Sequence, residues 1–173
     1  MEITWLMRLL LAFSFLTAAT SGWCADLHGR SSSQLLWFND FYNGRQIEFA
    51  EYLRLSVTNL DKAGKYSIQG YGRGSQDFSN GEGTSGRLYY LYGDFRDIYD
   101  KLDVKLGRQF VNYAAGTALI DGAEVNLKNI GPVGFSVFGG RDVAFGVNGG
   151  ELGHEGDYAL GLGAYLRGFP KTD

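Results

Sequence analysis

The stretch KLDVKLGRQFVNYAAGTALIDGAEVNLKN, residues 101–129, decides the fold of this chain. Apolar and charged residues alternate from Leu102 to Leu106, and they alternate again from Leu119 to Lys128. Between these runs, residues 111–117 predict a loop. Strict alternation is typical of a β-sheet with two different faces. In a soluble protein the apolar face packs on a core. In a membrane barrel it meets lipid, and the charged face lines a lumen.

The same alternation recurs along the chain and predicts about eight strands. The expected strands are residues 31–39, 46–58, 65–73, 87–96, 102–106, 119–128, 133–137 and 158–167. Short turns are expected after the second, fourth and sixth strands, and longer loops after the third, fifth and seventh. Short turns on one rim and long loops on the other are typical of outer-membrane barrels. We therefore predict an all-β fold, an antiparallel transmembrane β-barrel.

The amino terminus predicts export. Arg8 precedes an apolar run of about ten residues, which is typical of a secretory signal peptide and too short to span a bilayer. We expect residues 1–25 to be the signal peptide and residues 26–173 to form the barrel domain in the cell outer membrane. The only cysteine, Cys24, lies beside the expected cleavage site, so no disulfide framework is expected. The net charge of −3 argues against a nucleic-acid partner.

The polar parity of the expected strands supplies the candidate pore-lining residues. They are Glu48, Arg54, Arg73, Asp94, Arg96, Asp103, Lys105, Glu124, Lys128 and Arg167. A mixed-charge lining suits the passage of small hydrophilic solutes or ions, and it equally suits simple cross-strand pairing. Two carboxylates, Glu51 and Asp121, fall on the apolar parity. A bulge or a contact with another subunit of a homo-oligomer would accommodate Glu51.

The opening stretch also resembles a known class of protein. LGRQ (residues 106–109), within RQFVNYAAGTALIDG (108–122), and NIGPVGFSVFGGRD (129–142) are similar to segments of Gram-negative outer-membrane porins and related channel proteins. The resemblance implies a porin-type channel for passive diffusion, surrounded by outer-membrane lipid. A bulge at Gly107 would turn Arg108 into the lumen, which makes Arg108 a further candidate pore-lining residue. Alternatively, Arg108 is a cation that extends to the water at the rim of the barrel.

Several alternatives remain open at this point. Eight strands close into a barrel with room only for side chains, so the chain is expected to be the amino-terminal part of a larger barrel; a complete small barrel is the alternative. A non-conducting barrel for surface binding, a sleeve around a partner cytochrome and a soluble β-protein are the other functions considered. The chain has no HExxH, GxSxG or P-loop spacing, so neither enzymatic activity nor a cofactor is expected.

Overall fold

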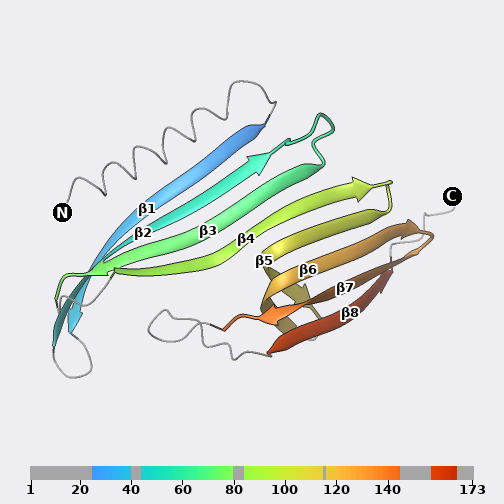
Figure 1. The fold of residues 1–173 in the computed structure, drawn as a ribbon. Helices are drawn as coiled ribbons and strands as arrows, with labels where there is room; N and C mark the ends of the chain where they lie inside the picture. Colours follow the sequence, from blue (N-terminus) through green and yellow to red (C-terminus); the bar gives the residue numbers. More distant parts are fainter. Residues whose placement is uncertain (1–24, 40–43, 80–83, 115, 145–156, 167–173) are drawn as a thin grey trace, which may run out of the picture.

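The computed structural model describes residues 25–39, 44–79, 84–114, 116–144 and 157–166. They form one antiparallel sheet of eight strands that neighbour one another in chain order (Figure 1). The strands are β1 (Asp26–Asn39), β2 (Arg45–Thr58), β3 (Tyr66–Asp77), β4 (Thr84–Ile98), β5 (Leu102–Tyr113), β6 (Gly116–Ile130), β7 (Val133–Asp142) and β8 (Tyr158–Leu166). The all-β class and the number of strands are therefore confirmed. The expected signal peptide lies outside the described residues, apart from residue 25.

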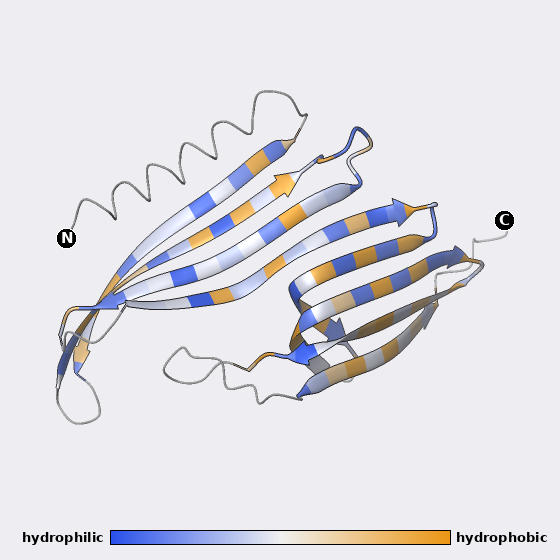
Figure 2. Ribbon diagram, viewed as in Figure 1, coloured by the Kyte–Doolittle hydropathy of each residue, from blue (hydrophilic) through white to orange (hydrophobic). Residues whose placement is uncertain are grey.

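The sheet has two faces of opposite character, as the striping of most strands in Figure 2 shows. The apolar face carries Ile47, Leu53 and Leu106, and the polar face carries Glu48, Arg54 and Lys105. Opposed residues of paired strands share a face, and the register joins apolar to apolar from strand to strand: Val104 pairs with Val125, which pairs with Val137. The alternation read from the sequence is therefore kept along these rows, whereas in β4 the register against β3 shifts between Tyr71 and Gly72, and the alternation is interrupted there.

Two of the expected long loops are shorter than predicted. β3 continues to Asp77 and β4 begins at Thr84, so residues 78–83 alone join them. β5 continues to Tyr113 and β6 begins at Gly116, which reduces the expected 111–117 loop to residues 114 and 115. The ends of β3 and β4 were underestimated because residues 74–77 and 84–86 are glycine and polar residues, which carry no apolar alternation. Residues 145–156 of the third long loop lie outside the described residues.

The turns at the opposite rim are tight and are built from residues that accept positive φ. Asp97, Tyr99 and Asp100 lie at φ 52°, 51° and 61° around the β4–β5 turn. In the β2–β3 turn, the Asp61 carboxylate accepts the backbone N–H groups of Lys65 at 2.7 Å and Tyr66 at 2.9 Å. Desolvation tends to raise the pKa of Asp61, but the hydrogen bonds from the backbone outweigh it and hold this pKa below its ordinary value.

The sheet is open in the described part of the chain. β1 pairs with β2 and β8 pairs with β7, and no pairing joins β1 to β8. Both outer strands therefore present unpaired backbone groups, which favour association with further strands.

Buried apolar side chains are concentrated at one place in the sheet. Of the five described hydrophobic residues that are buried, Val111, Leu119 and Ile120 belong to the β5–β6 hairpin, and Val143 follows β7 beside it. Elsewhere many large aliphatic side chains are exposed, up to 81% for Leu162. The packed core therefore sits around the end of one hairpin, and the apolar face is left uncovered.

Candidate functional site

The candidate site is the polar face, which the pairing register assembles from residues far apart in sequence. Asp94 of β4 is opposite Lys105 of β5, which is opposite Glu124 of β6. In the next row, Asp103 of β5 is opposite Asn126 of β6. These side chains and Arg96 line a hollow of about 230 Å³. Five of the predicted pore-lining residues therefore meet on one wall.

The charges of this hollow are mostly paired with one another. Arg96 donates to the buried carboxylate of Asp94, with Nη2 at 2.7 Å, and Lys105 Nζ lies 3.3 Å from Glu124. Lys128 bridges Asp103, at 2.6 Å, and Asp97. These opposite charges compensate one another, so this part of the polar face is close to neutral.

The other half of the polar face is basic and aromatic. Arg73 of β3 pairs with Glu48 of β2. Arg54 of β2 has no carboxylate partner among the described residues, and its guanidinium lies 5.2 Å from the ring centre of Tyr71. Arg167, the remaining predicted residue on this parity, lies outside the described residues.

Gly107 produces a bend in place of the expected bulge. The β5–β6 register runs through Gly107 without a shift, so alternation keeps Arg108 on the apolar face with Leu106. The expectation that Arg108 turns into the lumen is therefore wrong. There Arg108 donates to both carboxylate oxygens of Asp121, each at 2.7 Å, and to the carbonyl oxygen of Leu88. Asp121, a carboxylate on the apolar parity, is thus neutralised by the residue directly opposite it.

Three glycines on adjacent strands allow the bend. Gly107, at φ 121°, pairs with Gly122, which pairs with Gly140. A Cβ at Gly107 would overlap the carbonyl oxygen of Leu91, and one at Gly140 would come within 2.6 Å of the carbonyl oxygen of Asp121. The close approach of these backbones excludes any side chain along this line.

Beyond this line, the hairpin end folds back onto the polar face. We call residues 108–114 and 116–121 the folded tip. Tyr113 follows Gly107 by six residues, yet its ring would contact a Cβ placed on Gly163. The pairing register aligns Gly163 of β8 with Ser136 of β7, Asn126 of β6 and Asp103 of β5. Asp103 precedes Gly107 by four residues. An extended strand would carry Tyr113 away from this level, so the hairpin must reverse over β7 and β8.

The folded tip is held by aromatic and backbone contacts. The rings of Tyr113 and Phe138 are 4.7 Å apart, and the backbone N–H of Val143 donates to the carbonyl oxygen of Leu119 at 2.9 Å. A hollow of about 540 Å³ lies beside Tyr113, and Glu124, Asn126 and Tyr165 are among its lining residues. The tip therefore narrows the space over the polar face without filling it.

Glu51 lies on the apolar face, as its parity predicted, opposite Ser33 of β1 and Gly74 of β3. Its carboxylate accepts hydrogen bonds from the hydroxyl groups of Ser31 and Ser33. Neither a bulge nor a subunit contact is needed to give this carboxylate partners, because two neighbouring hydroxyl groups do so.

Sequence reasoning missed the folded tip and Arg30. The glycines at 107, 122 and 140 become a line only when the strands are paired, so their spacing in the chain carries no signal. Arg30 was missed because β1 begins at Asp26, whereas alternation indicated a start near Ser31. The sequence HGRSSS has no apolar member to mark a strand.

In the part of the chain that the structure describes, no helix is long and apolar enough to cross a membrane. The same residues bring together no group of three histidine, cysteine or carboxylate side chains that would hold a metal ion. No protein-family model, no curated protein and no solved structure matches this chain.

Proposed function

We propose that the sheet is part of the wall of an outer-membrane channel through which small hydrophilic solutes or ions diffuse passively. The observation that carries the proposal is the segregation of the two faces. The apolar face leaves Leu160 and Leu162 about four-fifths exposed, at 80% and 81%. A contiguous apolar surface of this kind needs a cover, and lipid provides one for a sheet whose other face is charged.

The folded tip gives this channel a constriction. Its residues narrow the space over β7 and β8, while the paired charges of Asp94, Lys105 and Glu124 keep the opposite wall hydrated. The folded tip selects solutes by size. The charges beside it are nearly balanced, so this part of the channel admits solutes of either charge. The mechanism requires no chemical step.

The wall needs more than these eight strands. A closed barrel of eight has an interior filled by its own side chains, and here the folded tip already occupies part of that interior. β8 runs antiparallel to β1, so a second copy of the chain is able to continue the sheet with the same type of pairing. The unpaired edges of both strands are available for this purpose.

The test is planar-bilayer conductance of the full chain after refolding in detergent. Discrete current steps are expected, and Tyr113→Ala should enlarge each step because it removes the ring that packs the folded tip against Phe138. Tyr99→Ala, at an exposed turn, is the matched control and should leave the step size unchanged. A protein that inserts fully and remains silent would overturn the proposal and support a non-conducting barrel.

A further inference from the structure

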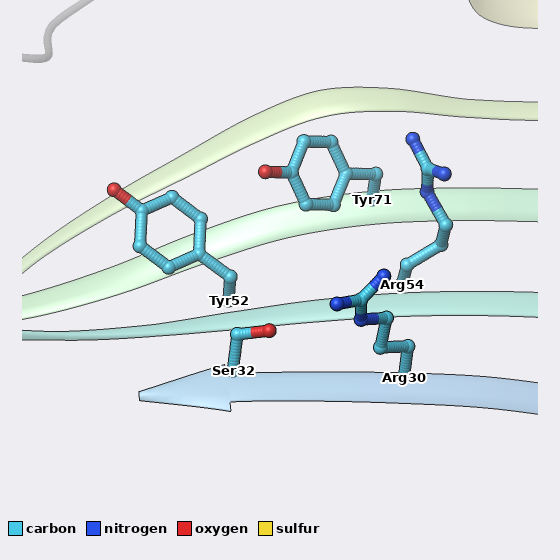
Figure 3. A pocket seen from close by; sticks show the side chains of 5 residues that line it. All are labelled: Arg30, Ser32, Tyr52, Arg54 and Tyr71. Carbon is cyan, nitrogen blue, oxygen red and sulfur yellow. The ribbon is translucent and has the colours of Figure 1, made fainter. Parts of the chain in front are cut away.

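A second hollow, of about 320 Å³, opens on the polar face of β1–β3, away from the folded tip. It is lined by Arg30, Ser32, Tyr52, Arg54 and Tyr71 (Figure 3). We call this set the arginine–tyrosine pocket. The register builds it from two adjacent rows: Arg30, Arg54 and Tyr71 are opposite one another in the first row, and Ser32 is opposite Tyr52 in the second. Small-molecule sites are typically about 300–1,000 Å³, so the volume suits a small solute.

The charge of this pocket is uncompensated. Arg30 and Arg54 are directly opposite each other on neighbouring strands, an arrangement that is destabilising for like charges. No acidic side chain lines the pocket. Within the described ranges neither guanidinium has a carboxylate partner, in contrast to Arg73 and Arg96, which each have one. Two adjacent guanidinium groups without an internal anion are suited to an external one.

Aromatic rings hold one of these guanidinium groups in place. Arg54 lies 5.2 Å from the ring centre of Tyr71 and 6.0 Å from that of Tyr90, both within the range of a cation–π interaction. Tyr71 in turn stacks on Tyr52, with ring centres 6.4 Å apart and planes inclined by 22°. The pocket therefore combines a preorganised cation with ring faces against which the body of an organic solute is able to lie.

We propose that the arginine–tyrosine pocket binds the oxyanion of a small phosphorylated solute. Arg30 and Arg54 donate hydrogen bonds to the phosphate oxygens, the Ser32 hydroxyl donates another, and Tyr52 and Tyr71 contact the carbon body. Guanidinium groups match phosphate in geometry as well as charge, and a dianion balances two of them. This inference deepens the proposed function by naming a class of solute, although binding itself does not require a pore.

The experiment is calorimetric titration of the full chain, refolded in detergent micelles, with inorganic phosphate and with glucose 6-phosphate. Saturable binding is expected for both ligands. Arg30→Gln and Arg54→Gln should each weaken it about tenfold or more, because each removes charge-assisted hydrogen bonds. Tyr52→Ala should weaken glucose 6-phosphate more than inorganic phosphate, which separates the contact with the carbon body from the contact with the anion.

The matched control is Arg45→Gln. Arg45 is exposed and alternates in phase with Ile47, which places it on the apolar face. The substitution therefore removes the same charge from the opposite face of the sheet. Binding in this variant should equal that of the parent chain. Absence of saturable binding would overturn the assignment. Weakening by Arg45→Gln equal to that by Arg30→Gln and Arg54→Gln would also overturn it, because it would indicate attraction by the overall charge of the protein. Conductance is measured separately, so failure of the pocket and failure of the channel are distinguishable.

Discussion

Two variants that each place one positive charge on a different face of β6 will show whether lipid or water covers that face. Val125 lies on the apolar face between Val104 and Val137, and the adjacent Asn126 lies on the polar face in the hollow lined by Asp94, Asp103 and Glu124. Val125→Arg and Asn126→Arg therefore add the same charge to the same strand, one residue apart, on opposite sides of the sheet.

The expected costs differ clearly. An arginine on the lipid face of a barrel near mid-bilayer destabilises it by about 2–4 kcal/mol, which corresponds to a factor of about 30 to about 700 in the folding equilibrium. Asn126→Arg loses the hydrogen bond that Asn126 accepts from the Tyr165 hydroxyl at 2.9 Å, a loss of about 1 kcal/mol. The carboxylates of the hollow are already paired with Arg96, Lys105 and Lys128, so they do not offset that loss.

The assay is urea titration of the full chain folded into phosphatidylcholine vesicles, followed by circular dichroism and by the gel mobility shift of folded protein. We expect Val125→Arg to be the less stable variant by about 1–3 kcal/mol, the difference between the two costs above. If water covered the apolar face, Val125→Arg would behave as a surface substitution and change stability by about 0.5 kcal/mol or less. Equal stability of the two variants would refute the membrane assignment.

Three further predictions test the bend and a turn. In a double-mutant cycle of Arg108→Gln and Asp121→Asn, urea titration should give a coupling energy of about 1–2 kcal/mol, because the pair is bidentate and the Arg108 side chain is largely enclosed, although Asp121 is partly exposed to solvent; additive effects would contradict the pairing. Gly122→Ala should cost about 1–3 kcal/mol, since its Cβ would overlap the neighbouring backbone, whereas Gly86→Ala meets nothing within 4 Å and should not destabilise; equal costs would argue against a close approach at Gly122. The folded-state pKa of Asp61 is lowered, so its stabilisation is present above the unfolded pKa of about 3.9 and is lost as the pH falls through the folded pKa. Asp61→Asn should therefore destabilise the protein at pH 7 and lose its effect in strong acid; a difference that persists there would exclude the linkage.

The number of strands and their two-faced character follow from the sequence because both are local properties. Alternation of period two places successive side chains on opposite faces wherever the chain is extended. Short connections make consecutive strands pair antiparallel. The runs around Leu53, Leu106 and Val125 therefore indicated the sheet, its order and the side on which most of the charges lie. Strand ends were predicted less well, since glycine- and serine-rich extensions such as residues 74–77 lack apolar members.

The folded tip and the arginine–tyrosine pocket depend on tertiary structure. Gly107, Gly122 and Gly140 act together only after pairing sets them side by side, and Tyr113 reaches the level of Asp103 only because the chain reverses there. Arg30 and Arg54 are 24 residues apart in the chain and become direct neighbours through the β1–β2 register. Sequence alone determined which face most side chains occupy, because alternation acts along one strand; Arg108, which was expected in the lumen and lies on the apolar face, is an exception. Tertiary structure decided which side chains meet, because register and bending are set by contacts between strands.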